Sequence, residues 1–238
     1  MATFQEKTGT DNPLNGTDVG YYSAPTFADI DSDGDLDAFI GESDPNINFY
    51  RNDGGTFTSV TGTGNPFDGV SVGYWSTPTF ADIDGDGDLD AFIGERDGNI
   101  NFYRNDSGTF TSVTGTDNPF NSTDVGAFST PTFADIDSDG DLDAFIGGYD
   151  PNINFYRNDS GTFTPVTGTG NPFNGTDVSY SSAPTLADID GDGDLDAVIG
   201  ANNGTINFYR NDSGTFTPVT GTGNPFNCLL YTSPSPRD

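Results

Sequence analysis

The 238-residue sequence contains no histidine and only seven lysine and arginine residues. Without imidazole, the chain lacks the usual general base of hydrolases, any Ser/His/Asp or Cys/His nucleophilic system, and any His-ligated zinc or copper site. The 37 acidic residues give a formal net charge of −30, which repels nucleic-acid phosphates and anionic lipids. This composition excludes most hydrolytic chemistry, argues against nucleic acid as a partner, and favours cations.

Long apolar runs and cysteine pairs are also missing. No segment approaches the roughly 20 apolar residues that cross a bilayer, so we expect no membrane insertion, and MATFQEKTGT shows no signal peptide. The single cysteine, Cys228, cannot form an internal disulfide. It opens CLLYTSPSPRD, residues 228–238, which departs in composition from the rest and resembles translated sequencing-adapter DNA. We therefore expect 228–238 to be a non-native tail and the chain to be a fragment.

The sequence is dominated by an internal repeat. Four near-identical segments, DIDSDGDLDA or DIDGDGDLDA, begin at Asp29, Asp82, Asp135 and Asp188, which are spaced 53 residues apart. A fixed period of this size is typical of propellers and solenoids. The repeat predicts one domain over residues 1–227, with units 2–54, 55–107, 108–160 and 161–213 and a partial copy, 214–227.

Each unit contains four strand-like runs separated by turn-forming residues. In the first unit they are residues 24–30, 36–41, 47–52 and 56–60, all rich in Phe, Ile, Tyr, Thr or Val. Helical periodicity is absent, and the first two runs lack the strict alternation of half-exposed strands. We predict an all-β protein, a β-propeller of four-stranded blades with four blades present as part of a larger propeller. A β-helix or a leucine-rich horseshoe fits the period less well. The expected blades are 24–60, 77–113, 130–166 and 183–219, and the side chains expected between blades include Phe27, Phe39, Phe49 and Phe57.

The DIDxDGDLD segment places carboxylates at alternate positions. In the first copy Asp29, Asp31 and Asp33 occupy positions 1, 3 and 5, a glycine follows at 6, and Asp37 closes the loop at 9. Ca²⁺ takes six to eight oxygen ligands, and a loop that turns at glycine can aim several carboxylates and a backbone carbonyl at one point. We predict that Asp35, at position 7, supplies its carbonyl and points its side chain outward. The pattern predicts about four Ca²⁺ ions, one per loop.

Five aspartates in each loop are therefore candidate metal ligands. They are Asp29, Asp31, Asp33, Asp35 and Asp37; Asp82, Asp84, Asp86, Asp88 and Asp90; Asp135, Asp137, Asp139, Asp141 and Asp143; and Asp188, Asp190, Asp192, Asp194 and Asp196. The alternative is a metal-free acidic turn, in which these carboxylates would repel one another. An EF-hand does not fit, because position 12 holds isoleucine instead of glutamate.

With strands flanking it, the loop resembles the calcium hairpin of FG-GAP and VCBS repeats, found in the integrin α-subunit N-terminal propeller and its bacterial relatives. The resemblance covers residues 2–227. It implies Ca²⁺ on the lower face, at the hairpin between the first two strands of each blade, and partner binding on the upper face. One departure is that integrin propellers have seven blades, whereas only four calcium hairpins are present here.

An arginine recurs in the FYRND segment of every unit, as Arg51, Arg104, Arg157 and Arg210. One arginine at the same place in each blade predicts a structural ion pair with a neighbouring aspartate such as Asp53.

Differences among the repeats concentrate in two segments. They are the loop after the second strand, ESDPN, ERDGN, GYDPN and ANNGT, and the approach to the first strand, GYYS, GYWS, GAFS and SYSS. In a propeller both segments emerge on the face away from the calcium hairpins. Exposed aromatic side chains beside carboxylates suit glycan or protein recognition, although such rings can also simply plug a structure. The candidate ligand-binding residues are Tyr22, Trp75, Phe128, Glu42, Glu95, Arg96 and Tyr149.

We therefore expect a calcium-binding, extracellular or cell-surface module for binding or adhesion, and not an enzyme. One alternative is a purely structural repeat of a large surface protein. A less favoured alternative is the non-catalytic part of a polysaccharide-active enzyme. A lyase or glycosidase that uses Glu42 or Glu95 with an aspartate is disfavoured, because Gly148 and Ala201 replace this glutamate in the other units. An open set of blades would also expose apolar faces and predicts self-association.

Overall fold

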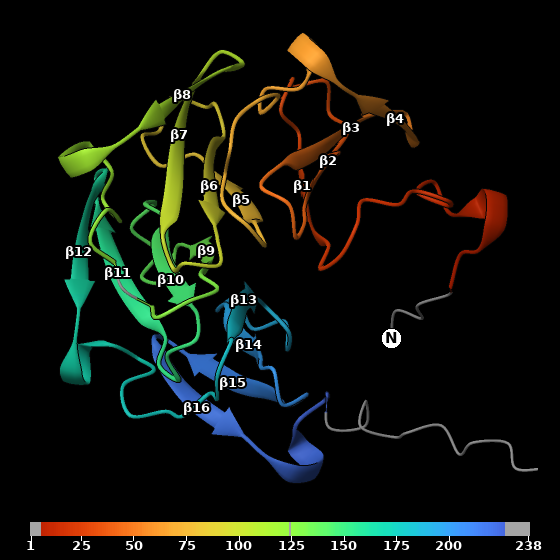
Figure 1. Ribbon diagram of the computed structural model, residues 1–238. Helices are drawn as coiled ribbons and strands as arrows, with labels where there is room; N and C mark the ends of the chain where they lie inside the picture. Colours follow the sequence, from red (N-terminus) through yellow and green to blue (C-terminus); the bar gives the residue numbers. More distant parts are fainter. Residues whose placement is uncertain (1–5, 124, 227–238) are drawn as a thin grey trace, which may run out of the picture. The chain divides into compact units, whose positions relative to one another are not determined.

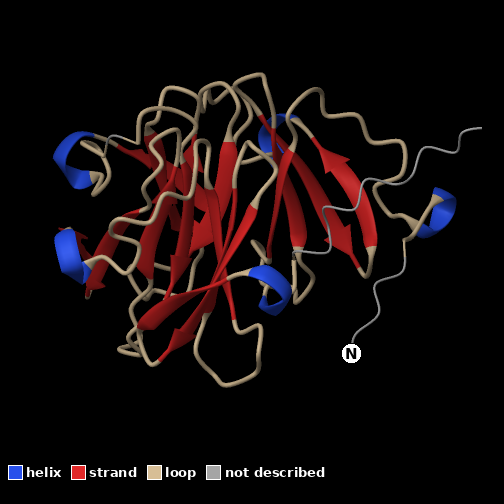
Figure 2. Ribbon diagram, turned by 90° about the horizontal axis from the view of Figure 1, so that it is seen from below, coloured by secondary structure: helices blue, strands red, loops and turns tan. Residues whose placement is uncertain are grey.

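The computed structural model describes residues 6–123 and 125–226, and the tail expected at 228–238 lies outside this range. Strands and turns make up the described chain, and its helices are single 3-10 turns (Figure 2). These turns are η1 (Gly9–Asp11), η2 (Gly62–Gly64), η3 (Gly115–Asp117), η4 (Gly168–Gly170) and η5 (Gly221–Gly223). Within the part that the model describes, no helix has the length and apolar character of a membrane span. The all-β prediction is confirmed.

The strands form four antiparallel sheets of four strands each, in which neighbouring strands follow chain order (Figure 1). The first two sheets contain β1 (Ala24–Ala28), β2 (Asp37–Gly41), β3 (Ile47–Asp53) and β4 (Thr56–Val60), then β5 (Thr77–Ala81), β6 (Asp90–Gly94), β7 (Ile100–Asp106) and β8 (Thr109–Val113). The last two contain β9 (Thr130–Ala134), β10 (Asp143–Gly147), β11 (Asn154–Asp159) and β12 (Thr162–Val166), then β13 (Ala183–Ala187), β14 (Asp196–Gly200), β15 (Ile206–Asp212) and β16 (Thr215–Val219). The four predicted blades are confirmed.

The chain divides into two compact units, residues 1–131 and 132–238. The first unit carries β1 to β8, the second carries β10 to β16, and β9 crosses the boundary. In the first unit, aromatic rings fill the space between the two sheets. Phe39 stacks on Phe49 with ring centroids 4.6 Å apart, and Phe67 meets Tyr103 edge to face at 5.6 Å. This face-to-face burial is how propeller blades pack.

The second unit repeats this core between its own sheets. Phe145 stacks on Phe155 at 4.8 Å, and Phe173 packs against Tyr209 and Phe216. Ile199 of β14 is fully buried in the same cluster. In both units the second strand of each sheet is the most deeply buried, which agrees with its lack of alternation in the sequence.

Two predicted core residues are not fully buried: Phe57 is partly buried and Phe27 is exposed. Phe39 and Phe49 lie in the core as expected, but Phe27 is 49% exposed and contacts Phe57 edge to face at 6.3 Å. The equivalent residue of the next blade, Phe80, packs against Phe39 of the blade before it. Phe27 remains exposed because the first unit has no earlier blade to cover β1.

We expect Phe39→Ala to lower the free energy of unfolding by about 3–5 kcal/mol, because it leaves a cavity among stacked rings. The half-exposed Phe27 provides the matched control, and Phe27→Ala should lower the stability much less. Chemical denaturation of the two variants tests this. Equal losses would contradict the assignment of the core.

Candidate metal centre

Each aspartate loop joins the first and second strands of one sheet. Carboxylate oxygens from positions 1, 3 and 5 lie within 4.8 Å of one another in all four loops. The clusters are Asp29, Asp31 and Asp33; Asp82, Asp84 and Asp86; Asp135, Asp137 and Asp139; and Asp188, Asp190 and Asp192. The structure thus brings together twelve of the predicted ligands, in four groups.

The position-1 aspartate shapes each loop, because backbone N–H groups of the loop donate hydrogen bonds to its carboxylate. In the second loop, Asp82 Oδ1 accepts a hydrogen bond from the backbone N–H of Gly85 at 2.8 Å, and Oδ2 accepts one from Gly87 at 3.0 Å. Gly87, at position 6, has a φ of 93°, a left-handed conformation that a side chain would strain. The requirement for glycine at this position therefore follows from the turn, as the sequence predicts.

The position-7 aspartate points away from the cluster. Asp88 Oδ2 accepts a hydrogen bond from the backbone N–H of Ser107 at 2.7 Å, in the turn between β7 and β8. The other loops make the same contact with Gly54, Ser160 and Ser213. This hydrogen bond connects the loop to the neighbouring hairpin. It agrees with the outward orientation predicted for the position-7 side chain. That its carbonyl binds metal stays a prediction.

The closing aspartate at position 9 is buried, between 0 and 1% exposed in every loop. Asp90 Oδ1 accepts a hydrogen bond from the backbone N–H of Asn105 at 2.8 Å, whereas its Oδ2 is buried with no hydrogen-bond partner. Asp37 and Asp143 have the same unpartnered Oδ2. A buried carboxylate oxygen without a partner is costly, so a bound cation beside it fits these residues.

The electrostatics of these buried carboxylates agree with this view. Burial raises the pKa of Asp90 and of Asp143 to about 6, and the negative charges at positions 3 and 5 add to the effect. The hydrogen bond from the β7 backbone to Asp90 opposes the rise. Burial likewise raises the pKa of Asp37. The closing aspartates therefore hold their negative charge only at a cost that a divalent cation would offset.

The fourth loop differs from the others. Its closing residue, Asp196, accepts hydrogen bonds at both oxygens, from the N–H of Asn211 at 2.9 Å and of Ile189 at 3.1 Å. Its position-1 residue, Asp188, is exposed, whereas the equivalent residues of the other loops are partly buried. This carboxylate is already satisfied within the protein.

The recurrent arginines pair with the position-3 aspartates, and the expected pairing with residues such as Asp53 is wrong. The distances are 3.3 Å for Arg51 and Asp31, 3.4 Å for Arg104 and Asp84, 3.3 Å for Arg157 and Asp137, and 2.8 Å for Arg210 and Asp190. Asp53 is the last residue of β3, and the arginine side chain reaches instead toward the aspartate loop before β2. These arginine side chains are nearly half exposed, so each pair contributes little stability.

Sequence reasoning missed a recurrent asparagine, which is buried in three blades and partly buried in the first. Asn105 donates its backbone N–H to Asp90, its side-chain amide donates to the Leu89 carbonyl at 3.1 Å, and its Oδ1 accepts from Gly108 at 2.8 Å. Asn52, Asn158 and Asn211 make the same contacts. The signal was available, because this asparagine is unchanged in all four FYRND segments.

The candidate ligand-binding residues lie in the two variable segments. In the first unit, the Tyr22 ring contacts Trp75 at a tilt of 40°, and Trp75 stacks on Phe128. Glu42 accepts a hydrogen bond from the Asn48 side chain at 3.0 Å, and Arg96 pairs with Asp97 at 3.1 Å. Glu95 is buried and bonds within its own loop. In the second unit, Tyr149 contacts Tyr180 at 5.0 Å. Ligand binding by these residues stays a prediction.

A family model described as FG-GAP-like repeat matches residues 29–93, 82–146 and 135–199. Among solved structures, an Agrocybe aegerita lectin that specifically recognises non-reducing terminal N-acetylglucosamine is 22% identical with a TM-score of 0.54, over 85% of this chain and 52% of the lectin. A Bacillus licheniformis rhamnogalacturonan lyase is 13% identical with a TM-score of 0.38, over 82% of this chain and 50% of the lyase. The chain therefore spans about half the length of each. No curated protein sequence matches it.

The raised pKa values predict how pH acts on the calcium-free protein. Asp90 and Asp143 have a pKa of about 6 when folded and 3.8 as the ordinary value, so the folded state binds more protons between these limits. Their stabilising contribution is complete below pH 3.8 and is lost as the pH rises through 6, by up to roughly 3 kcal/mol for each carboxylate. We expect the melting temperature of chelator-treated protein to fall over this range, and saturating Ca²⁺ to reverse the trend. A melting temperature that is flat across this range without calcium would contradict this.

Proposed function

Because the chain belongs to the FG-GAP-like repeat family, we propose that its aspartate loops bind about four Ca²⁺ ions and that the calcium-loaded blades act as an extracellular binding or adhesion module for glycan or protein, without enzymatic activity. The observation that carries the calcium assignment is the unpartnered, fully buried Oδ2 of Asp37, Asp90 and Asp143. Acidic surface turns are common without metal, but a buried carboxylate oxygen with no donor is not.

The donor set suits Ca²⁺. Positions 1, 3, 5 and 9 offer carboxylate oxygens, and position 7 offers a carbonyl, all of them hard ligands. A chain with neither histidine nor a cysteine in these loops does not present the nitrogen and sulfur ligands that zinc and copper prefer. When bound, Ca²⁺ supplies positive charge that neutralises the clustered carboxylates. The chain's own part is to hold those oxygens together through the glycine turn and the contact from position 7 to the next hairpin.

The loops are not expected to be equal. In the first three, a cation satisfies an oxygen that otherwise has no partner. In the fourth, Asp196 already accepts two backbone hydrogen bonds, and metal binding there competes with the one from Ile189. We infer that the fourth loop binds Ca²⁺ more weakly than the second and third.

The binding role is supported by where the repeats vary. Their differences gather in two loops that lie together at the end of the blades away from the calcium hairpins, and these loops carry exposed aromatic residues. We expect these loops to bind Ca²⁺ with the dissociation constant typical of extracellular modules, about 10⁻⁴–10⁻³ M. This expected affinity supports the extracellular assignment, because sites this weak fill only at the calcium concentrations outside the cell. The likeness to the lectin concerns the fold alone, so it does not choose between glycan and protein.

The metal assignment predicts opposite effects of one substitution in two conditions. Asp90→Asn removes a buried charge, so it should raise the melting temperature of the calcium-free protein and remove one binding site. At about 100 times the dissociation constant each site contributes about 2.7 kcal/mol, which the variant should lose. Isothermal titration and thermal melting, with and without EGTA, measure both effects.

Asp97→Asn is the matched control, because Asp97 is an exposed aspartate outside the loops. It should leave the number of calcium sites unchanged. The companion variant Asp196→Asn should lose less calcium-dependent stability than Asp90→Asn. A wild-type melting temperature that is indifferent to EGTA, or calcium binding that survives in Asp90→Asn with unchanged stoichiometry, would refute the assignment.

A further inference from the structure

Three aromatic residues at equivalent repeat positions form a continuous row of ring contacts in the first unit, here called the stack, in which Tyr22 is tilted by 40° against Trp75. The ring centroids of Tyr22 and Trp75 are 4.9 Å apart, and Trp75 lies 4.8 Å from Phe128 with the ring planes inclined by 15°. The three residues have φ values of 58°, 55° and 55°, a left-handed conformation that bulky side chains rarely adopt. Each such residue stores strain on the order of 1–3 kcal/mol, and strain of this kind gathers at functional sites.

Backbone hydrogen bonds join this stack to the loops that follow the second strands. The N–H of Ser43 donates to the Tyr21 carbonyl at 2.8 Å, and the N–H of Arg96 donates to the Tyr74 carbonyl at 2.8 Å. In return, the N–H of Phe128 donates to the Arg96 carbonyl at 3.1 Å. The two variable segments of the repeat therefore make one surface within this unit.

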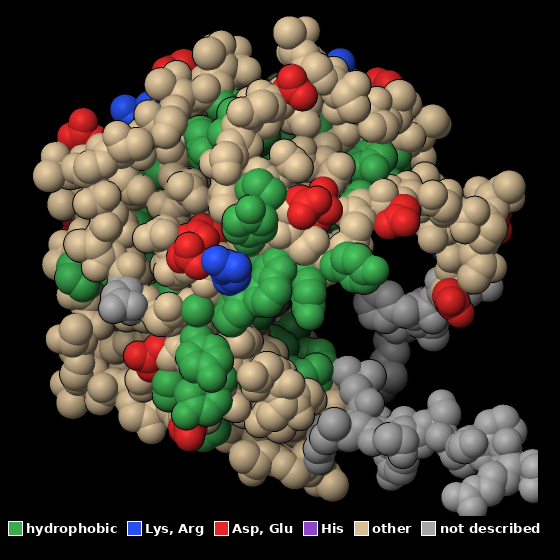
Figure 3. Space-filling view, viewed as in Figure 1, with side chains coloured by type: hydrophobic (Ala, Val, Ile, Leu, Met, Phe, Trp, Pro, Cys, Tyr) green, Lys and Arg blue, Asp and Glu red, His purple; other side chains and the backbone are tan. Residues whose placement is uncertain are grey.

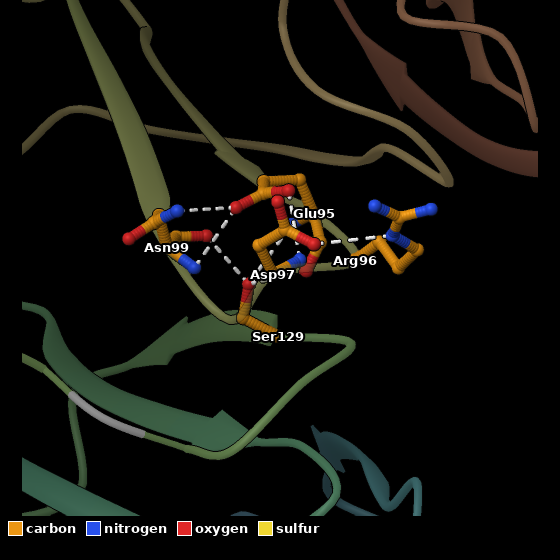
Figure 4. A network of polar contacts seen from close by, with 5 residues as sticks. All are labelled: Glu95, Arg96, Asp97, Asn99 and Ser129. Carbon is orange, nitrogen blue, oxygen red and sulfur yellow. Dashed lines mark hydrogen bonds and ion pairs between the residues drawn. The ribbon is translucent and has the colours of Figure 1, made fainter.

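Glu95 holds the loop that carries Arg96 in shape through the polar contacts shown in Figure 4. Glu95 is only 5% exposed, and its carboxylate accepts hydrogen bonds from the backbone N–H of Asp97 at 2.8 Å and of Asn99 at 3.2 Å. Ser129 accepts from the Glu95 N–H at 2.9 Å and donates to the Asn99 carbonyl at 2.6 Å. A loop fixed by a buried carboxylate is preorganised, which lowers the entropy cost of binding.

The exposed part of this surface combines flat rings with a neutral polar edge. We call Tyr21, Tyr22, Tyr74 and Trp75 the aromatic platform; Tyr22 is 72% and Tyr74 50% exposed. The Arg96 guanidinium lies 5.3 Å from the centre of the Tyr74 ring and pairs with Asp97 at 3.1 Å. Apolar side chains next to acidic and basic ones are visible on the face shown in Figure 3. Arg96 and Asp97 thus place hydrogen-bond donors and acceptors together beside the Tyr74 ring, and their opposite charges balance each other.

From these contacts we infer that the aromatic platform binds a neutral carbohydrate, with the C–H face of a pyranose ring on Tyr22 and its hydroxyl groups on Arg96 and Asp97. The net charge of −30 disfavours uronates, sulfated glycans and other anions. The Arg96–Asp97 pair is locally neutral, which gives a basic peptide no specific counter-charge at the platform and matches the paired donor and acceptor of a sugar hydroxyl. This inference rests on the binding role proposed above and selects glycan over protein.

Saturation-transfer NMR in excess Ca²⁺ tests the inference with cellotetraose, mannotetraose and tetraacetylchitotetraose, and with tetragalacturonate as the anionic comparison. At least one neutral oligosaccharide should receive saturation from the protein, and the tetragalacturonate should not. Tyr22→Ala and Trp75→Ala should each weaken the affinity about tenfold or more. Phe27→Ala, which removes an exposed aromatic residue of the same unit outside the platform, is the control and should bind as the wild type does.

Tyr22 is the more decisive position, because a side chain that is mostly exposed can be removed without loss of the core. No transfer to any neutral oligosaccharide at about 10 mM would overturn the inference, and so would binding that persists in Tyr22→Ala. Hexa-arginine that binds in place of the sugars and is lost in Tyr22→Ala would overturn it in favour of a basic peptide. Calcium titration of the same samples separates the two proposals: intact calcium binding without sugar binding refutes only this inference, and sugar binding without any calcium response refutes only the calcium assignment.

Discussion

The burial of one carboxylate at the start of each second strand organises every blade. Asp90 is the first residue of β6 and accepts a hydrogen bond from the backbone N–H of Asn105 in β7. The Asn105 side chain in turn donates to the Leu89 carbonyl and accepts from the Gly108 N–H. The loop before the strand, the strand itself and the next hairpin are thereby joined at one point. In the first three blades the same point buries a carboxylate oxygen without a partner, where a cation or a proton would offset the charge. The fold and the candidate metal site are therefore two aspects of one arrangement.

Much of this fold is predictable from the sequence because its determinants are local and repeated. The 53-residue period sets the blades, the strands agree within two residues with the runs rich in aromatic and β-branched residues, and the glycine at position 6 marks the turn. The clusters at positions 1, 3 and 5 follow from alternate spacing in a tight loop. None of these features depends on knowing how one blade meets another.

The features that escaped prediction depend on contacts between distant segments. The pairing of Arg51 with Asp31 instead of Asp53 depends on where the side chain of β3 reaches, not on closeness in sequence. The exposure of Phe27 depends on the absence of an earlier blade in its unit, although its sequence context matches that of the packed Phe80. Identical loops can likewise differ, since Asp196 is satisfied by Ile189 while Asp90 has an unpartnered oxygen. Repetition in sequence therefore guarantees the same elements but not the same environments.

The position of the second strand explains why the repeats can vary at one end and not at the other. All five residues of β6 are buried; Asp90 at its start closes the aspartate loop, and Glu95 directly after its end fixes the variable loop. Gly94, the last residue of this strand, lies so close to Ser129 that a side chain there would collide with the Ser129 carbonyl. Beyond the buried Glu95, Arg96 and Asp97 lie at the surface, where a change of side chain costs little. The buried strand thus separates the aspartate loop, whose carboxylates make the recurrent hydrogen bonds of the blade, from an aromatic end whose residues differ among the repeats.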